Sequence, residues 1–187
     1  MDYYYNQNDI DIISWQLERE HIFIAGVVER CAYGYPRVML LNPVQEDRGQ
    51  GTVNYEALSN LFWLTCPHLN DAIHRLEDSG LIERTAAFIA GERELLTLMK
   101  KAHASFYYFR KKMYRHFIGS EMPLEMIRLI NSGIAGTADI STLKCLHAHF
   151  AFSRVCGDDI AGSITARLLD NILDCDDGKC AYADRKQ

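Results

Sequence analysis

The most concentrated reactive chemistry in the chain lies in segment 144–149, which has the sequence KCLHAH. The segment carries a thiol, two imidazoles and an ammonium group, and the apolar spacing around it predicts a helix. On a helix Cys145 and His149 share one face, whereas His147 lies nearer to Lys144. Cys145 and His149 could supply two ligands of a metal ion. A structural zinc ion takes four, so the others must come from elsewhere in the chain.

Two more cysteines lie where predicted elements end. Cys31 is at the bend of a predicted hairpin, and Cys66 ends a predicted strand immediately before Pro67. Thiolates at such positions can converge on a helix face. Thiolate and imidazole ligands suit zinc or an iron–sulfur cluster, which are therefore the cofactors that we expect. The predicted metal site, with a structural or regulatory role, has these ligands: Cys31, Cys66, Cys145 and His149.

The cysteines also allow other interpretations. Cys175 or Cys180 could replace His149 as a ligand. The chain has no Cys-x-x-Cys pair, the spacing that most strongly indicates zinc. Free cysteines are often small buried hydrophobic residues without chemistry, and this interpretation stays open beside the metal site.

A second hypothesis is thiol catalysis, with Cys145 or Cys66 as the nucleophile and His147 or His149 as the base. A nucleophilic cysteine needs a lowered pKa and a nearby base or cation, and Lys144 is such a cation. No acidic or amide residue stands at an obvious spacing to orient the base. Whether the protein is an enzyme is therefore left open.

A third hypothesis is a binding or adaptor protein without chemistry. Segment 100–116 has six of the chain's 20 basic residues and no acidic residue, which leaves 14 basic against 25 acidic residues elsewhere. The candidate anion-binding residues are Lys100, Lys101, Arg110, Lys111, Lys112 and Arg115. The partner would be an anionic molecule such as a nucleic acid, bound by charge. A solvated helix face is the alternative, and no motif for sequence-specific DNA binding is present.

The elements that must position these residues follow from apolar periodicity and from turn residues. The predicted strands cover 21–28, 37–41 and 59–65, with a surface loop at 42–54. The predicted helices cover about 8–17, 67–80, 81–90, 92–117, 123–131, 142–155 and 158–173. This order predicts an α+β fold, with a small antiparallel N-terminal sheet of three strands packed against a larger set of helices. We expect a single α+β domain over 1–174 and a mobile tail over 175–187.

Length and composition set further bounds. The chain has 187 residues, enough for one sizeable core, and a net charge of −5. No apolar run approaches the length of a membrane span, and the polar, tyrosine-rich start lacks the features of a signal peptide. We therefore expect a cytoplasmic protein that does not associate with membranes, whose six cysteines are free thiols or metal ligands.

Several motifs, in order, resemble those of the bacterial family catalogued as Domain of Unknown Function 501. They are RCAYGYPRV at 30–38, LFWLTCPHL at 61–69, RLE at 75–77 with Gly80, GIAG at 133–136 and KCLHAH at 144–149. A weaker similarity includes His103, and the motifs add Arg75 and His103 to the candidate site residues.

The resemblance implies a setting more than a reaction, because the family has no established activity. Its members are often encoded near exopolyphosphatase and a small septum-formation protein, and this neighbourhood suggests polyphosphate as the anion. The family commonly has one more histidine after the Cys-Leu-His segment, where this chain has Phe152.

Overall fold

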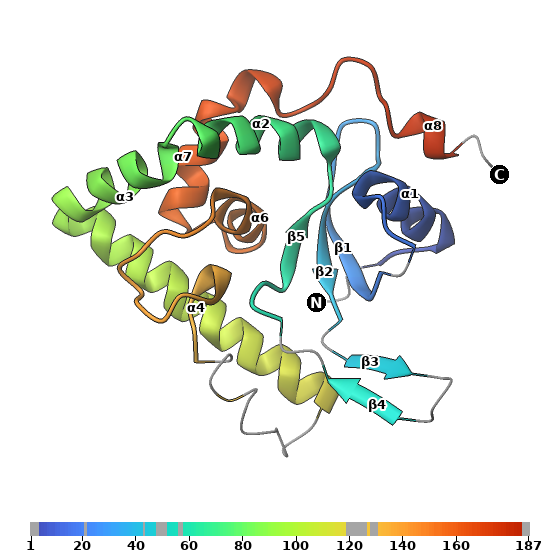
Figure 1. Ribbon diagram of the computed structural model, residues 1–187, viewed down its shortest axis with the longest axis horizontal. Helices are drawn as coiled ribbons and strands as arrows, with labels where there is room; N and C mark the ends of the chain where they lie inside the picture. Colours follow the sequence, from blue (N-terminus) through green and yellow to red (C-terminus); the bar gives the residue numbers. More distant parts are fainter. Residues whose placement is uncertain are drawn as a thin grey trace.

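The centre of the computed structural model is a three-stranded antiparallel sheet with a helix on each of its faces (Figure 1). The structure describes residues 4–20, 22–42, 44–47, 52–55, 58–118, 127 and 131–184. The strands of the sheet are β1 (Ile24–Arg30), β2 (Pro36–Leu41) and β5 (Phe62–Leu64), in the order β1-β2-β5. The sheet and the helices around it confirm the predicted α+β class.

Helices make up most of the remaining structure. In the described residues they are α1 (Gln7–Leu17), α2 (Pro67–Asp78), α3 (Leu81–Gly91), α4 (Arg93–Ile118), α6 (Leu146–Cys156), α7 (Ile160–Leu168) and α8 (Ala181–Asp184), with 3-10 turns η1 (Ile134–Gly136) and η2 (Asp170–Ile172). No helix among the described residues is both long enough and apolar enough to span a membrane. The predicted helix at 123–131 lies almost wholly outside the described residues.

Strand β2 is buried along its whole length because both of its faces are covered. Val38 and Leu40 belong to the core cluster that includes α6, whereas Met39 and Leu41 pack in a second cluster with Ile13 of α1. Alternate side chains of a strand point to opposite faces, so α1 and α6 lie on the two sides of the sheet (Figure 1). Because α2 directly follows β5, on which α6 packs, α2 and α6 also contact each other.

Residues 44–47 and 52–55 form a second, two-stranded sheet, β3 (Val44–Asp47) with β4 (Thr52–Tyr55). The prediction of a surface loop at 42–54 is therefore wrong over these residues. Glycine and proline suggested a loop, but the two arms contain β-favouring valine, threonine and tyrosine, and they pair antiparallel from Val44 with Tyr55 to Asp47 with Thr52.

Two helix boundaries differ from the prediction in ways that matter for the site. Cys145 is the N-cap of α6, with extended backbone angles (φ −154°, ψ 118°), and the helix begins at Leu146. Cys145 therefore does not lie on a helix face with His149. The predicted helix at 158–173 consists of α7 and η2, because the backbone leaves the α-helical conformation at Leu169.

Phe152 lies in the middle of the core. Its ring centroid is 5.0 Å from that of Phe106 on α4 and 5.8 Å from that of Phe62 on β5. Its exposed fraction is 1%. The position where the resemblance implied a histidine thus has an apolar packing role in this chain, where it joins α6 to α4 and the sheet.

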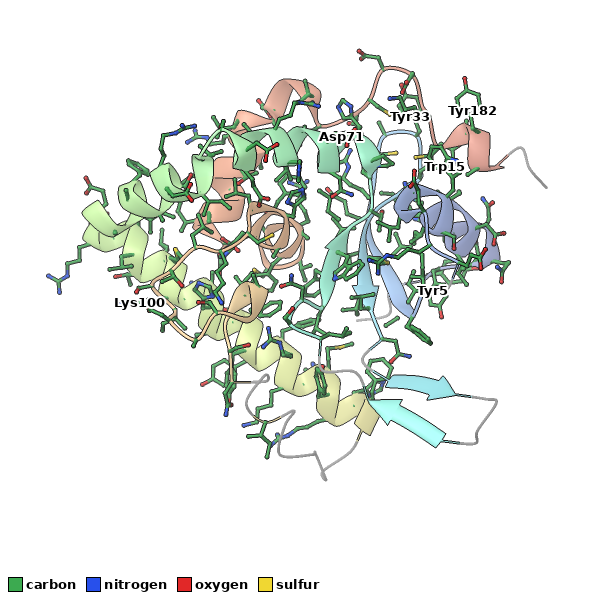
Figure 2. All side chains as sticks on the ribbon, viewed as in Figure 1. Tyr5, Trp15, Tyr33, Asp71, Lys100 and Tyr182 are labelled. Carbon is green, nitrogen blue, oxygen red and sulfur yellow. The ribbon has the colours of Figure 1, made fainter. Side chains whose placement is uncertain are left out.

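The C-terminal tail packs against α1 in the structure. Cys180 and Ala183 are buried, and they form a small cluster with Ile12 and Trp15. Figure 2 shows Trp15 of α1 close to α8. Gln16 of α1 donates a hydrogen bond of 3.2 Å to the Cys180 sulfur. The predicted domain boundary and the predicted mobility of the tail stay predictions.

Candidate metal centre

Helices α2 and α6 bring two histidines and one glutamate together. His74 and Glu77 are three residues apart on α2, so they share a helix face, and His147 is in the first turn of α6. One potential ligand atom from each of the three lies within 4.8 Å of the others. Among the described residues this is the one group of three or more potential ligands at such spacing. Two imidazoles and a carboxylate suit zinc and other first-row transition metals.

Both nitrogens of the His147 ring face oxygen atoms. Nε2 is 3.2 Å from the backbone oxygen of Asn70, and Nδ1 is 3.2 Å from Oε1 of Glu77. A neutral imidazole has one N–H, so it can satisfy one of these two acceptors. The other contact needs a second proton or a cation.

Glu77 is fixed in place by the start of α6. Its Oε1 accepts a hydrogen bond of 2.6 Å from the backbone N–H of Leu146, one of the donors that a helix leaves free at its N-terminus. The Cys145 thiol also interacts with Glu77. The carboxylate thus holds α2 and α6 together and orients one of the three potential ligands. His74 is the exposed member of the group, with a side chain that is 70% accessible.

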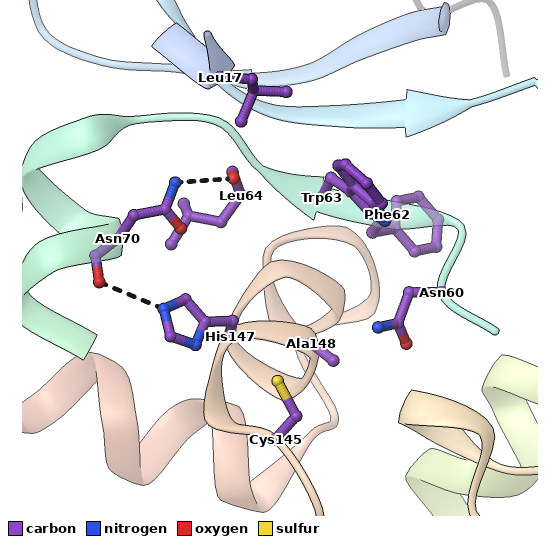
Figure 3. Close-up of a pocket in the computed structure, with 9 residues that line it drawn as sticks. All are labelled: Leu17, Asn60, Phe62, Trp63, Leu64, Asn70, Cys145, His147 and Ala148. Carbon is purple, nitrogen blue, oxygen red and sulfur yellow. Dashed lines mark hydrogen bonds between the residues drawn. The ribbon is translucent and has the colours of Figure 1, made fainter. Parts of the chain in front are cut away.

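A cavity of about 270 Å³ adjoins His147 (Figure 3). Its lining residues are Leu17, Asn60, Phe62, Trp63, Leu64, Asn70, Cys145, His147 and Ala148. The Asn70 amide donates to the backbone oxygen of Leu64 at 3.1 Å, so the side chain is fixed at the wall of the cavity (Figure 3). A small molecule in this space would contact apolar walls, two amides, a thiol and an imidazole.

Comparison with known proteins agrees with the resemblance seen in the sequence. The family model described as "Protein of unknown function (DUF501)" matches residues 27–167. The chain belongs to the DUF501 family. No curated protein and no solved structure matches it. The match to DUF501 includes His74, Glu77 and His147, but it does not include α1 or the tail.

The ligands predicted from the sequence of this DUF501 chain are not brought together by the structure. No three of Cys31, Cys66, Cys145 and His149 belong to a group at ligand spacing. Cys66 lies at the N-terminus of α2, Cys31 at the hairpin bend, and Cys145 beside Glu77. The sequence indicated the right segment of α6, but His147 is the residue that joins the cluster.

The two candidate nucleophiles are held as thiols. Burial raises the pKa of Cys66 to about 11. Burial, followed by the negative charge of Glu77, also raises the pKa of Cys145. A nucleophilic cysteine needs the opposite shift. The environments of both thiols therefore argue against the thiol-enzyme hypothesis.

His149 lies in the core, where its ring connects α6 to α7. Nδ1 is 3.0 and 2.8 Å from the two carboxylate oxygens of Asp159, and both side chains are fully buried. Asp159 also accepts from the backbone N–H of Gly162 as the N-cap of α7. The second candidate histidine, His103, packs edge-on against His149 with ring centroids 5.3 Å apart.

His103 is fixed in an uncharged state. Its Nδ1 accepts a hydrogen bond of 3.0 Å from the backbone N–H of Ile134. Burial, and next the neighbouring His149, lower the pKa of His103 to about 4. We conclude that His103 and His149 are buried connectors of α4, α6 and α7. Arg75 and Lys144, the other two candidates, are exposed and stand outside the metal group.

The basic segment on α4 does not form one continuous charged surface. Arg110 is fully buried and donates to the backbone oxygens of Ser59, Ser132 and Gly133. Arg110 therefore has to be removed from the predicted anion-binding set. Lys101 pairs with Asp158 at 3.3 Å. Anion binding stays a prediction for the other members: Lys100, Lys101, Lys111, Lys112 and Arg115.

His74 and Glu77 were not among the ligands predicted from the sequence. Their spacing, His-x-x-Glu, is a signal in itself, because residues three apart on a helix share a face. A helix was predicted over them, so the pair could have been found. What the sequence could not supply is the packing of α2 against the start of α6, which brings His147 to the pair.

Proposed function

We propose that this protein binds a divalent transition-metal ion, with zinc as the first candidate, through His74, Glu77 and His147. The observation that carries the proposal is the His147 ring, which lies between two oxygen acceptors, the Asn70 carbonyl and the Glu77 carboxylate. A proton on Nε2 serves Asn70 and leaves a lone pair on Nδ1 that faces Glu77. A cation at that position removes the repulsion between the lone pair and the carboxylate.

The spacing of the two groups supports the same proposal. Zinc–nitrogen and zinc–oxygen bonds of about 2.0 to 2.2 Å at a tetrahedral angle put the two ligand atoms roughly 3.4 Å apart. Nδ1 of His147 and Oε1 of Glu77 are 3.2 Å apart. A metal-bound histidine commonly donates its other N–H to a backbone carbonyl, as Nε2 can do to Asn70.

Three protein ligands leave a fourth position for water or a substrate. Structural zinc sites are usually closed by four protein ligands, whereas catalytic sites keep one position open. His147 also lines the cavity of about 270 Å³, so a molecule bound there would lie near the ion. We therefore favour a centre that acts on, or senses, a small molecule over a purely structural ion.

The test is a titration of the purified full chain with Zn²⁺ and Co²⁺, followed by calorimetry and by the visible spectrum of cobalt. The wild type should bind one ion at this site. In His147→Ala the affinity for that ion should be at least about 100-fold lower than in the wild type. His116→Ala is the matched control, because His116 is an exposed histidine at the far end of α4. Equal binding by the wild type and folded His147→Ala would overturn the proposal.

A further inference from the structure

The C-terminal segment 174–180 has the sequence DCDDGKC, with no large apolar residue, yet it returns to the bend between β1 and β2. Asp174 accepts from the backbone N–H of Ala32 at 3.0 Å and forms an ion pair with Arg37. The Tyr33 hydroxyl donates to the backbone oxygen of Asp176 at 3.3 Å. Figure 2 shows Tyr33 beside this segment. Polar contacts rather than a hydrophobic face thus hold the segment.

The return of this segment brings four cysteines into one region of the molecule. Cys175 follows Asp174, which bonds the residue next to Cys31. Gln16 donates both to the Cys180 sulfur, at 3.2 Å, and to the backbone oxygen of Pro36, at 2.8 Å.

Cys66 adjoins the same strand end. Its backbone N–H donates to the oxygen of Arg37, the residue after Pro36. Burial, and to a smaller extent the neighbouring Cys180, raise the pKa of Cys66; burial, and to a smaller extent Cys31 and Cys175, raise the pKa of Cys180. The hydrogen bonds therefore place the four cysteine residues around one end of the sheet.

We propose that Cys31, Cys66, Cys175 and Cys180 form a second metal site, selective for thiophilic ions such as Zn²⁺ or Cd²⁺, which the C-terminal segment closes. Four thiolates are a complete tetrahedral set, the composition of closed structural sites. The site is independent of the His74–Glu77–His147 centre and does not require that centre to bind metal. Two of its ligands, Cys175 and Cys180, lie outside the DUF501 match.

The surroundings of the sulfurs contain donors that suit bound thiolates. The backbone N–H groups of His68 and Leu69, at the start of α2, lower the pKa of Cys66, against the larger opposite effect of its burial. The Gln16 amide does the same for Cys180. N–H donors around coordinated atoms orient the ligands and offset the negative charge of a thiolate-rich site.

Ion binding must draw the sulfurs closer together. No three of these four thiols lie within 4.8 Å of one another in the described residues. The segment with Cys175 and Cys180 is held at the hairpin bend by polar contacts of Asp174 and Asp176. We therefore expect the ion to tighten the C-terminal segment onto the hairpin bend.

The experiment is a Co²⁺ titration of the full-length, reduced protein under anaerobic conditions. Thiolate ligands give an intense sulfur-to-cobalt charge-transfer absorption in the near ultraviolet, which histidine and glutamate ligands do not give. The band should appear in the wild type and be lost in Cys66→Ser and Cys180→Ser. Cys156→Ser is the matched control, since Cys156 lies at the far end of α6 and should keep the band.

Limited proteolysis with trypsin tests whether the ion tightens the C-terminal segment onto the hairpin bend. Trypsin cleaves after Lys179, whose side chain is 58% exposed. Zn²⁺ should slow this cleavage at least about tenfold in the wild type and leave it unchanged in Cys66→Ser. A folded wild type without the charge-transfer band would overturn the proposal. A band that is lost in Cys145→Ser but kept in Cys180→Ser would also overturn it, in favour of the ligands predicted from the sequence.

Discussion

At the scale of single residues, His147 and Glu77 are the most informative pair. Each residue makes a further contact besides the one proposed with the metal. His147 contacts the Asn70 carbonyl, and Glu77 accepts a hydrogen bond from the backbone N–H of Leu146 at the start of α6. Such outer contacts fix the orientation of a ligand before the ion arrives. They also allow the charge of Glu77 to be tested apart from its role in the fold.

Glu77→Gln keeps an acceptor for the Leu146 N–H but removes the negative charge. We expect the affinity for Zn²⁺ at this site to fall about 10- to 100-fold, with a change in the free energy of unfolding of less than about 1 kcal/mol. Competition with a zinc chelator and a urea unfolding curve measure the two quantities. An unchanged zinc affinity in Glu77→Gln would mean that the carboxylate is a helix cap and no ligand.

The buried His103 should make the free energy of unfolding depend on pH. Its folded pKa of about 4 lies below the ordinary value of 6.5 because its burial disfavours the charged ring. The unfolded chain therefore binds more protons between these values, so stability is fully present above pH 6.5 and is lost as the pH falls towards 4. The loss should be of the order of 3 kcal/mol, and His103→Gln should flatten this part of the curve. Parallel curves of unfolding free energy against pH for both proteins would contradict the assignment.

At the scale of elements, the close packing of α6 on α7 depends on Gly162. A Cβ atom there would lie 2.3 Å from the backbone oxygen of His149 and 2.5 Å from the Cβ of Ser153. Since one of these neighbours is backbone, the helices would have to separate. Asp159, which caps α7 and bonds His149, sets the same junction.

Gly162→Ala should therefore destabilise the protein by about 1 to 3 kcal/mol. The matched control is Gly91→Ala, also at a helical glycine, where a Cβ would have no neighbour within 4 Å. This change should be neutral or stabilising by up to about 1 kcal/mol. Urea unfolding of both variants is the measurement, and equal effects would contradict the packing described for α6 and α7.

Sequence patterns predicted most elements because apolar periodicity reports burial directly. Helices α2, α3 and α4 end within a few residues of the expected positions for this reason. The exact start of α6 was not predictable in this way. The Cys145 side chain is compatible with either a helix or a cap. The extended backbone at Cys145 is found together with a long-range contact, the hydrogen bond from Leu146 to Glu77.

At the scale of the whole molecule, Arg110 connects parts that are distant in the sequence. From α4 it donates to the backbone oxygens of Ser59, just before β5, and of Ser132 and Gly133, just before η1. Burial lowers the pKa of Arg110 to about 10, so the side chain stays charged at neutral pH. The sequence suggested a surface cation, because a basic run on a helix does not reveal which of its members faces inward.

Arg110→Met should destabilise the fold by about 2 to 4 kcal/mol, because several buried carbonyls lose their donor at once. Arg115→Met removes an exposed arginine from the same helix and should change stability by less than about 0.5 kcal/mol. Thermal and urea unfolding compare the two. Similar small effects in both variants would show that Arg110 is not the connector described.

Long-range contacts also explain why the sequence predicted one residue of the candidate site, His147, but not its partners. The chemistry of segment 144–149 was evident from residue types, and the imidazole of His147 was among the candidates. Which partner it meets depends on the packing of α2 against α6, two helices separated by about 70 residues along the chain. The return of the C-terminal segment to the hairpin bend is likewise a long-range contact, made by polar groups that leave no periodic signal.

The most direct test of the metal centre is an anomalous difference map, recorded at the zinc absorption edge from crystals grown with Zn²⁺. We expect a peak about 2.0 to 2.2 Å from Nδ1 of His147 and from ligand atoms of Glu77 and His74. The fourth position should be held by a water or a molecule from the adjoining cavity. A map with no peak between α2 and α6, in crystals with zinc bound elsewhere, would contradict the central claim.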